Sequence, residues 1–451
     1  MTPATKKFSL ITYGCQMNYA DTDRITTVLA AHGFERTSEL IDSDLVLFNT
    51  CMVRQKPEDK VFGHLLTIRK LKREKPHLRV GLAGCMVRKS GVSKRFESAL
   101  TSDDALLKRS REIDFVFRTK DLLHLGTLLK DVGLVETNYE FTEDDYLELI
   151  PTTASTASAF VPIMTGCNRY CTYCVVPYSR GKEVSRSIAD VVHEVEILSE
   201  RGLKEVTLLG QIVNSYHPEG YKKGDTSFVE LIRAVHEIPG IERIRYTSPH
   251  PQYMTDELIE AHRVLPKLCR HIHLPVQSGS TAVLERMNRG YTREHYLDLV
   301  RRIRTAVPDI AITTDIIAGF CGETEEEFLE SVSLYQDVGF DFAFLAQYSP
   351  RPESYSARKW EDDVSKEDKQ RRWHILNDTL LSESAKKYRK LIHQDVSVLV
   401  EKHFGDTCMG KTPDAKTVKF QTSTPDIFVG TIQRVNISEV RETEAIGVLL
   451  S

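Results

Sequence analysis

The sequence GCNRYCTYC, residues 166–174, carries Cys167, Cys171 and Cys174 in the spacing CxxxCxxC. This spacing lets three thiolates reach one inorganic centre. A structural zinc site normally takes four protein ligands, and the nearest downstream histidine is only His193. Thiolates also hold iron-sulfur clusters, and a 4Fe-4S cluster with three cysteine ligands keeps one iron open. The motif therefore predicts a cluster suited to radical chemistry, with a partial zinc knuckle or three buried thiols as the alternative.

Three apolar runs upstream of this motif each end in a cysteine. The runs are FSLITYGC, LVLFNTC and RVGLAGC, which end in Cys15, Cys51 and Cys85. Helical patterns between them give the alternation of a parallel sheet with crossover helices. Ligands gather beyond the carboxyl ends of such strands, so these cysteines are predicted to form a second three-thiolate metal site. A relay of free thiols for sulfur transfer is the alternative.

A longer strand and helix alternation follows the CxxxCxxC motif. Its six apolar runs are AFVPIMTGC, EVTLLGQ, RIRYTS, HIHLPVQ, AITTDIIAGF and FAFLAQY. Six strands cannot close with the geometry of the usual eight-stranded barrel. We therefore expect an open (βα)6 partial barrel whose active face lies at the strand carboxyl ends, where the motif follows the first strand.

The last part of the chain changes its hydrophobic period to two. The short runs VSVLVEK, KTVKF, IFVGTIQRVN and AIGVLL follow Asp395 and are separated by turn residues. They predict a small C-terminal antiparallel β-barrel of the kind that binds RNA. The predicted fold class is α/β, with a Rossmann-like N-terminal domain, the partial barrel and this small barrel.

Composition limits the possible compartments and partners. The chain has 451 residues, more than one core usually supports, and no apolar run approaches the ~20 residues that cross a bilayer. With no signal-peptide pattern and nine cysteines, an odd number, we expect a cytoplasmic, metal-binding protein without a membrane partner. The net charge of −4 means that any RNA contact is local. From residue 391 on, six Lys and Arg stand against eight Asp and Glu, and Lys411, Lys416 and Lys419 are the candidates for a basic patch.

The CxxxCxxC motif with an aromatic residue, Tyr173, before its last cysteine resembles the signature of the radical S-adenosylmethionine (SAM) enzymes. With the N-terminal cysteine triad and the terminal barrel, nearly the whole chain resembles the methylthiotransferase family. The flanks YCTYCVVPYSRGKEVSR, LLGQIVNSY, HLPVQSGS, MNRGYT and YSPRPES are most similar to the branch that acts on transfer RNA. One departure is Cys321, which stands where the family usually has proline; we expect this thiol to be incidental.

The resemblance implies a division of the chain into four parts. These are a methylthiotransferase N-terminal domain at 6–122, a linker at 123–152, a radical SAM core at 153–386 and a TRAM RNA-binding barrel at 388–451. It also implies two 4Fe-4S clusters, an auxiliary one on Cys15, Cys51 and Cys85 and a radical-generating one on Cys167, Cys171 and Cys174.

The reaction implied is addition of a methylthio group to carbon 2 of an isopentenylated adenosine beside the anticodon of tRNA. One SAM would methylate a sulfur of the auxiliary cluster, and a second would give the radical that removes the strongly held hydrogen. We expect a monomer that takes electrons from a donor such as flavodoxin or ferredoxin. The alternatives are a ribosomal-protein (aspartyl) or threonylcarbamoyladenosine methylthiotransferase and, from another class, a zinc-dependent RNA-binding protein.

Residues at the strand carboxyl ends are the candidates for SAM contacts. They are Gly210, Gln211, Ser248, Gln277, Ser278 and Gly319, together with Tyr173 of the motif. A polar structural turn is the alternative at each strand-end position. Gln16 and Asn18 are candidate donors to the auxiliary cluster or contacts to the base, although Asn18 also suits a helix cap. Arg245 is predicted to alternate toward solvent, and Cys269 and Cys408 are predicted to be structural.

Overall fold

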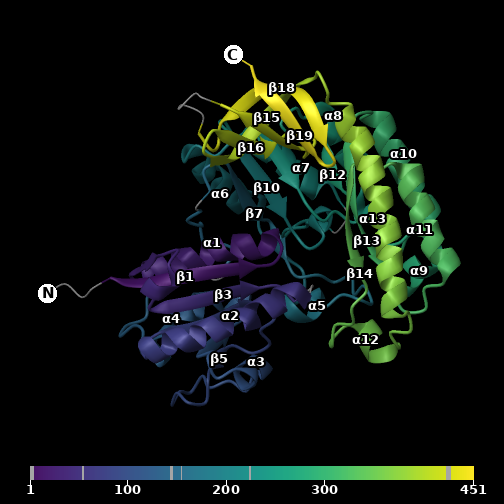
Figure 1. The fold of residues 1–451 in the computed structure, drawn as a ribbon. Coiled ribbons are helices and arrows are strands. Elements are labelled where there is room, and N and C mark those ends of the chain that lie inside the picture. The colour runs from purple at the N-terminus through teal and green to yellow at the C-terminus, as the bar shows by residue number, and fades with distance from the viewer. Residues whose placement is uncertain are drawn as a thin grey trace. The chain divides into compact units, whose positions relative to one another are not determined.

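The computed structural model describes residues 5–52, 55–142, 146–153, 155–222, 225–422 and 428–450. The chain divides into two compact units, whose elements are labelled in Figure 1. Unit 1 consists of Met1–Ala154, Thr165–Asn168 and Val175–Glu183. Unit 2 consists of Ser155–Met164, Arg169–Cys174 and Val184–Ser451. The division into four parts stays a prediction.

Unit 1 is built on a six-stranded sheet in the order β2-β1-β3-β4-β6-β5. The strands are β1 (Lys6–Tyr13), β2 (Phe34–Arg36), β3 (Leu45–Thr50), β4 (Arg79–Gly84), β5 (Gly91–Val92) and β6 (Phe115–Phe117). Its helices are α1 (Gln16–Ala31), α2 (Gln55–Glu74), α3 (Ala105–Arg109), α4 (Leu125–Asp131) and α5 (Val176–Ser179), with 3₁₀ turns η1 (Leu40–Asp42) and η2 (Thr119–His124). All strand pairs are parallel except β5 with β6, which confirms the predicted Rossmann-like arrangement.

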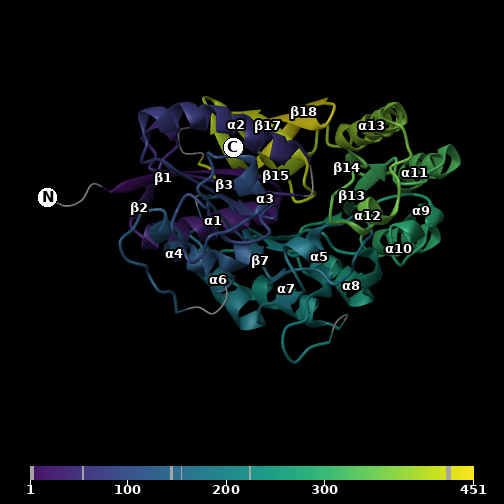
Figure 2. The same ribbon diagram turned by 90° about the horizontal axis from the view of Figure 1, so that it is seen from below.

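Helices cover both faces of this sheet. Leu45 and Leu47 of β3 pack with residues of α1 and α4, whereas Val46 and Phe48 pack with residues of α2 and α3. Figure 2 shows α2 on one side of β1 and β3, and α1 and α4 on the other. A strand buried on both faces favours apolar residues on both sides, which is why the first four residues of β3, LVLF, show no polar alternation.

Part of the predicted linker belongs to the core of unit 1. Residues 125–131 form α4, and Tyr146, Leu147 and Leu149 are buried in the same hydrophobic cluster as α1. Because most residues of this stretch are polar, its composition did not indicate that these three apolar side chains would cover one face of the sheet.

Unit 2 contains the six predicted parallel strands in sequence order. They are β7 (Ser158–Pro162), β10 (Glu205–Leu209), β11 (Arg243–Tyr246), β12 (His271–His273), β13 (Ala311–Ala318) and β14 (Phe342–Gln347). They pair as β11-β10-β7 and β12-β13-β14, and a parallel bridge from Ile244 to Leu268 joins the two halves. Among the strands that the structure describes, β7 and β14 do not pair with each other, so the predicted open partial barrel is confirmed.

Helices line one side of this curved sheet. They are α6 (Ile188–Glu200), α7 (Ser227–Glu237), α8 (Asp256–Val264), α9 (Thr281–Arg286), α10 (Arg293–Ala306), α11 (Glu325–Val338), α12 (Tyr355–Lys359) and α13 (Lys366–Arg389). Short elements between them are β8 (Met164–Thr165), β9 (Val184–Ser185), η3 (Val213–Ser215) and η4 (Pro251–Tyr253). Local sequence sets the ends of α11, because Thr324 and Glu327 form a capping box and Gly339 ends the helix at φ +57°.

The C-terminal residues form a closed five-stranded barrel in the order β15-β16-β17-β19-β18. The strands are β15 (Asp395–Phe404), β16 (Thr407–Lys411), β17 (Thr417–Gln421), β18 (Ile432–Arg441) and β19 (Glu444–Leu449). The barrel was predicted as antiparallel, and four of its strand pairs are so. The pair of β17 with β19 is parallel and completes the closure.

Hydrogen bonds from two arginines to backbone carbonyls attach this barrel to the partial barrel within unit 2. Arg243 donates to the carbonyl of Lys411 at 2.8 Å, and Arg245 donates to the carbonyls of Thr412 and Pro413 at 2.8 and 3.0 Å. The expectation that Arg245 faces solvent is wrong: its side chain is 10% exposed because Glu205 pairs with it at 2.9 Å.

The predicted basic patch of the small barrel is also wrong in part. Lys416 is buried and forms ion pairs with Asp341 and Asp414. Lys419 pairs with Glu444 at 2.7 Å, so its charge is compensated as well. Of the three lysines, only Lys411 has an exposed side chain.

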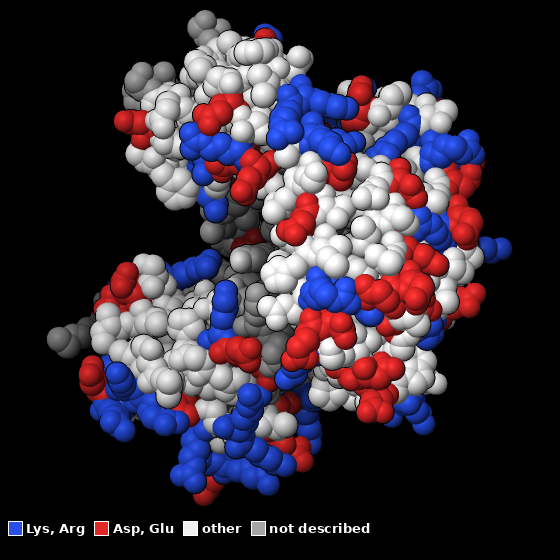
Figure 3. Space-filling view, turned by 45° about the vertical axis from the view of Figure 1, so that its right-hand side comes forward, with Lys and Arg blue, Asp and Glu red and all other residues white. Residues whose placement is uncertain are grey.

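Surface charge is mixed. Figure 3 shows Lys and Arg interspersed with Asp and Glu over much of the visible face, with Lys and Arg gathered along its lower edge. Within the described ranges no helix is long and apolar enough to span a membrane.

Candidate functional site

The three N-terminal cysteines lie at the carboxyl ends of three neighbouring strands, as predicted. Cys51 follows β3, and its N–H donates to the carbonyl of Tyr13 at the end of β1 at 2.8 Å. Cys85 follows β4, and its N–H donates to the carbonyl of Thr50 at the end of β3 at 3.0 Å. Cys15 follows β1 by two residues and caps α1. The ladder thus carries all three cysteines to one edge of the sheet.

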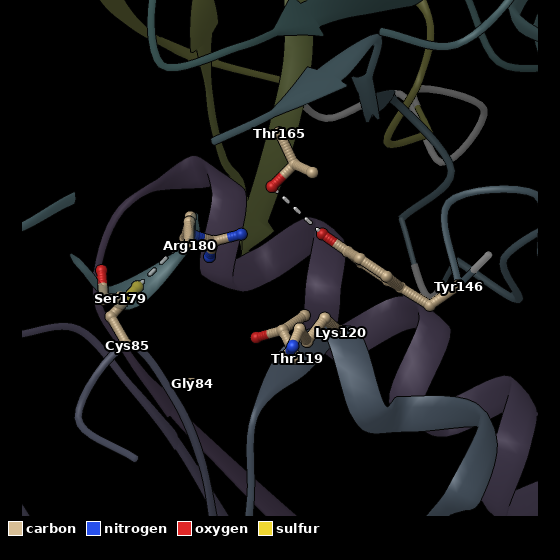
Figure 4. A pocket seen from close by; sticks show the side chains of 8 residues that line it. All are labelled: Gly84, Cys85, Thr119, Lys120, Tyr146, Thr165, Ser179 and Arg180. Carbon is tan, nitrogen blue, oxygen red and sulfur yellow. Dashed lines mark hydrogen bonds between the residues drawn. The ribbon is translucent and has the colours of Figure 1, made fainter. Parts of the chain in front are cut away.

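A buried cation lies among these thiols. Arg180 donates from Nε to the Cys85 sulfur at 3.3 Å (Figure 4) and from Nη2 to an Asp21 oxygen at 2.6 Å. The side chains of Arg180 and Asp21 are 5% and 0% exposed. Burial alone would lower the pKa of Arg180, but the Asp21 carboxylate together with Cys85 and Tyr146 raises the pKa well above its usual range, so the cation persists.

The thiols differ in acidity. A hydrogen bond with the Cys51 thiol lowers the pKa of Cys15 to about 6, against the opposing effect of desolvation and with help from the Arg180 charge. Burial raises the pKa of Cys85. An anionic sulfur is therefore easiest to form at Cys15, the exposed member of the triad.

Asn18 fixes the position of Cys15. Its Oδ1 accepts from the Cys15 N–H at 3.2 Å and from the Cys15 thiol at 3.4 Å, and its Nδ2 donates to Asn49 at 3.2 Å. These contacts combine the two roles considered for Asn18, a helix cap and a partner of the triad. Gln16 has an exposed side chain.

The loop with the CxxxCxxC motif is shared by the two units. Cys167 belongs to unit 1, where its N–H donates to the carbonyl of Gly181 at 3.0 Å. Gly166 has φ +78°, and an added Cβ would lie 1.9 Å from the carbonyl oxygen of Lys182, so only glycine fits before this cysteine.

Cys171 and Cys174 belong to unit 2, where a turn places the Cys174 N–H 2.9 Å from the carbonyl of Cys171. A second buried arginine, Arg289, donates to the Cys171 sulfur at 3.3 Å and to the Tyr173 hydroxyl at 3.4 Å. Burial raises the pKa of Tyr173 well above its usual range, so the phenol stays neutral. Each group of cysteines thus has one buried guanidinium against a sulfur.

The donor sets fit iron-sulfur ligation chemically. The nine cysteines all lie within the described residues, and each is a free thiol there. Among the residues described, no three or more His, Cys, Asp or Glu side chains are arranged as a ready metal site. The thiols and the N–H groups of Arg180 and Arg289 nevertheless match what a thiolate-held cluster needs, namely soft ligands and donors to their sulfurs. Cluster ligation at these positions remains a prediction.

Among the candidate SAM contacts, Gln211 has the clearest sign of a missing partner. It follows β10, and its side-chain oxygen is buried without a hydrogen bond. Gly210 is packed so closely that an added Cβ would lie 2.7 Å from Met164. Ser248 and Gln277 follow β11 and β12 with φ of +59° and +77°, a strained conformation that often marks functional positions in non-glycine residues.

Two other candidates have structural roles that explain them. The buried Ser278 hydroxyl contacts the Ser331 hydroxyl at 3.3 Å and accepts from the Ser280 N–H at 3.2 Å. Gly319 has φ +72°, and its N–H donates to Glu323 at 2.6 Å. Whether either contacts SAM remains a prediction.

A polar and aromatic group that sequence reasoning missed lies on the sheet face opposite the helices. His273 on β12 approaches Thr313 at 3.0 Å and Asp315 at 3.3 Å on β13, and its ring lies 5.6 Å from that of Phe344 on β14. The neighbouring residue Ala343 faces the helix-covered core. In the sequence, the alternation of residues in HIH, TTD and FAF could have indicated which side chains share this face of the sheet.

Two of the three remaining cysteines lie in hydrophobic surroundings, and the third is buried. Cys321 packs with Phe320 and Tyr348, and Cys408 lies in the core of the small barrel. Cys269 is 4% exposed, and burial raises its pKa to about 11.

Comparison with known proteins agrees with this geometry. Residues 161–335 match the Radical SAM superfamily, and residues 7–107 match the Uncharacterized protein family UPF0004. A solved structure, the radical S-adenosylmethionine methyltransferase TsrM from Kitasatospora setae, aligns with a TM-score of 0.55 at 16% identity. The alignment covers 78% of this chain and 75% of that one, and it shows a shared fold.

Two curated relatives match over nearly their full length. The chain is 41% identical to tRNA-2-methylthio-N(6)-dimethylallyladenosine synthase of Neisseria meningitidis serogroup A, over 94% of this chain and 95% of the relative. It is 38% identical to the synthase of the same name from Clostridium perfringens (strain SM101), over 98% and 97%. Since identity of this order extends through both units, the chain belongs to the tRNA-2-methylthio-N(6)-dimethylallyladenosine synthase family of radical SAM enzymes.

Proposed function

We propose that this chain is a tRNA methylthiotransferase that adds a methylthio group to carbon 2 of isopentenylated adenosine beside the anticodon. The observation that carries the proposal is the second cysteine triad at one edge of the unit 1 sheet, in a chain that also has the CxxxCxxC loop. Radical generation requires only the three cysteines of the CxxxCxxC loop. A second group of thiols is expected where a sulfur must be held and transferred.

Each triad is proposed to hold one 4Fe-4S cluster. When bound, these clusters would supply the electron that cleaves SAM and the sulfur that is transferred. The chain's own contribution is to hold the ligands: Arg289 donates to the Cys171 sulfur and Arg180 to the Cys85 sulfur, each from a buried position. Such donors stabilise thiolate charge in surroundings that exclude water.

The face of the sheet that carries Phe344 is the proposed site of the target base. The Phe344 ring is 49% exposed and contacts Phe342, so it offers a surface for stacking an unstacked adenine and for its apolar isopentenyl group. The Asp315 carboxylate beside it can accept from the N6–H group. It would repel the carboxylates of threonylcarbamoyl and aspartyl substrates, which favours the isopentenylated base over both alternatives.

The partners follow from this reaction. They are a tRNA anticodon stem-loop that carries isopentenyladenosine and an electron donor such as flavodoxin or ferredoxin. The proposal includes a monomeric state and a cytoplasmic location, as expected from the sequence.

The test is anaerobic reconstitution of the chain, followed by incubation with SAM, a reductant and isopentenylated tRNA. Mass analysis of the digested nucleosides should show 2-methylthio-isopentenyladenosine. Threonylcarbamoylated tRNA and a ribosomal-protein peptide serve as alternative substrates and should give no product. Iron should amount to about eight atoms per chain, as expected for two 4Fe-4S clusters. Stoichiometric zinc without iron would exclude the enzyme and favour an RNA-binding protein.

A further inference from the structure

Polar side chains on the sheet face opposite the helices form a hydrogen-bonded row in unit 2 that ends on Asp315. His271 and His273 of β12 alternate with Ile272, which belongs to the helix-covered core. On the neighbouring strand β13, Thr313 pairs in register with His273. Because side chains alternate along a strand, both histidines, Thr313 and Asp315 share one face of the sheet.

The Thr313 hydroxyl is the centre of this row. Its Oγ1 lies 3.0 Å from Nε2 of His271 and 3.0 Å from Nδ1 of His273. The other ring nitrogen of His273, Nε2, lies 3.3 Å from Oδ2 of Asp315. A hydroxyl group has one proton, so Thr313 can donate to only one of its two imidazole neighbours and accepts from the other.

Burial determines the direction in which the row donates. It lowers the pKa of His271 well below its usual range, with help from the charge of Arg245, so this ring is neutral. A carboxylate oxygen only accepts, so the His273 nitrogen that contacts Asp315 carries a proton. With His273 neutral, its Nδ1 accepts from the Thr313 hydroxyl. Thr313 in turn accepts from the Nε2–H group of His271, and every contact of the row is satisfied.

The row leaves one oxygen of Asp315 available. His273 donates to Oδ2, whereas Oδ1 accepts no hydrogen bond from the residues that the structure describes. The Asp315 side chain is 33% exposed, so a ligand can reach it. The Phe344 ring lies edge to face with His273 at 5.6 Å and is 49% exposed. This face therefore offers one oriented anionic acceptor beside one aromatic surface.

We propose that His271, Thr313 and His273 are positioning residues that turn the open oxygen of Asp315 to the target base, so that the site selects a base with an N–H group at its 6-position. The inference rests on the proposed function, since it takes the isopentenylated adenine to lie on Phe344. An N6 atom with one alkyl group keeps one hydrogen, which Oδ1 accepts. An oxygen in that position has no hydrogen to donate and places a lone pair against the carboxylate.

The test compares two synthetic anticodon stem-loop RNAs on the full chain with its clusters. One carries N6-isopentenyladenine at the target position, and the other carries 6-isopentenyloxypurine, which has an ether oxygen in place of the N6–H group. The measured quantity is the ratio of the two kcat/KM values, in which a general loss of activity cancels. The wild type should prefer the N6–H base roughly 10- to 100-fold, the scale of one hydrogen bond to a charged group.

Three variants test the row itself. Thr313→Val interrupts it with a side chain of the same shape, and His273→Leu removes the donor to Asp315. Each should lower the preference at least about fivefold, because the carboxylate is no longer held. His273→Gln should restore most of it, since its amide nitrogen can take the place of Nε2. The control His295→Leu, at an exposed histidine on α10, should keep the wild-type ratio.

Asp315→Asn tests the direction of the row. Because His273 donates, the amide oxygen of the variant must face His273, and its NH2 group must face the base. The preference for the N6–H base should therefore fall to one or below. Adding Thr313→Val to Asp315→Asn frees the His273 tautomer and lets the amide turn over, so part of the preference should return. A wild-type preference in Asp315→Asn alone would overturn the proposal.

The outcomes separate this inference from the proposed function. If the wild type does not modify the RNA with N6-isopentenyladenine, the proposed function is wrong. If it modifies both RNAs with equal kcat/KM, the proposed function stands and selection by Asp315 is wrong. A preference that persists undiminished in Thr313→Val and His273→Leu contradicts the positioning role. Where a variant turns over too slowly, the ratio of the Kd values of the two RNAs, measured without SAM, gives the same comparison.

Discussion

Arg180 and Arg289 were not selected as functional residues from the sequence, although they lie in the flanks YCTYCVVPYSRGKEVSR and MNRGYT. Each donates to a cysteine sulfur at 3.3 Å from a position 95 or 118 residues away along the chain. Asp21 balances the charge of Arg180, whereas the neighbours of Arg289 are the phenols of Tyr173 and Tyr291 and backbone carbonyls. Contacts at this separation depend on the fold, so no local pattern marks them.

Cys321 is the opposite case. Its thiol could in principle bind a metal, but its surroundings are apolar. It is 5% exposed among Phe320, Tyr348 and Met287. Cys321→Ala should keep the iron content and the product yield of the wild type, because its sulfur fills space in an apolar cluster. The measurements are iron analysis and product yield, with Cys171→Ala as the control that should fail in both. Loss of half the iron in Cys321→Ala would reveal an overlooked ligand.

Phe344 is the residue on which recognition of the base is expected to depend. Base and aromatic ring stacking contributes ~1–3 kcal/mol, so Phe344→Ala should lower kcat/KM for isopentenylated tRNA by roughly 5- to 150-fold. Deoxyadenosine formation from SAM without RNA should be unchanged.

The matched control is Leu329→Ala, which truncates a side chain of similar exposure, 50%, on α11. If both variants retain wild-type kcat/KM, the target base lies elsewhere.

At the scale of elements, four residues that are not glycine have positive φ in loops of unit 2. Tyr170, Ser248, Gln277 and Asn288 all have φ between +52° and +77° and lie in loops of unit 2. Two of them were selected as SAM contacts from their position alone. Their backbone conformation could not be foreseen, because a left-handed region normally favours glycine and these residues are serine, glutamine, asparagine and tyrosine.

Helix α8 packs a histidine into the core of the partial barrel, and we expect this to make unit 2 sensitive to acid. His262 is 2% exposed and contacts the Tyr246 hydroxyl of β11 at 2.6 Å. Burial lowers the pKa of His262 from 6.5 to about 4. Between these values the unfolded chain binds a proton that the folded chain does not, so stability falls as pH falls from 6.5 to 4.

The expected loss is roughly 3 kcal/mol across this window, at about 1.4 kcal/mol per pH unit. His262→Gln should flatten this part of the pH dependence of the free energy of unfolding, measured with denaturant at several pH values. The exposed His295→Gln on α10 is the control and should keep the wild-type slope. An unchanged slope in His262→Gln would place the acid sensitivity in another group.

At the scale of the whole molecule, the two cysteine triads divide the chemistry between sulfur storage and radical generation. Replacing Cys15, Cys51 and Cys85 with Ala should remove about half the iron, if each triad holds one cluster of the same size. The variant should still cleave SAM to 5′-deoxyadenosine, because the CxxxCxxC loop is intact. It should form no methylthioadenosine, since no sulfur is available for transfer.

Two readouts accompany this triple variant. Without reductant, acid quenching of the wild type with SAM should release methanethiol, and the variant should release none. The complementary replacement of Cys167, Cys171 and Cys174 should abolish deoxyadenosine formation. Methylthio product from the first variant, or deoxyadenosine from the second, would contradict the assignment of the triads.

The sequence by itself determined the class of chemistry and the order of the elements. Cysteine spacing is local, and hydrophobic period is local, so CxxxCxxC, the strand-end cysteines, the six parallel strands and the closing barrel could all be predicted. The predicted strand pairing erred where β17 pairs in parallel with β19 and where β5 pairs antiparallel with β6.

Only the tertiary structure determines which charged side chains are exposed and which buried polar atoms lack a hydrogen-bond partner. Lys416 looks like a surface cation in the sequence, but Asp341, 75 residues earlier in the chain, pairs with it in the interior. Likewise Arg180, Tyr146 and Thr165 meet beside Cys85 although they come from separate stretches of the chain. The free energy of a charge depends on burial and on partners that folding brings from far away, and neither is encoded in a local pattern.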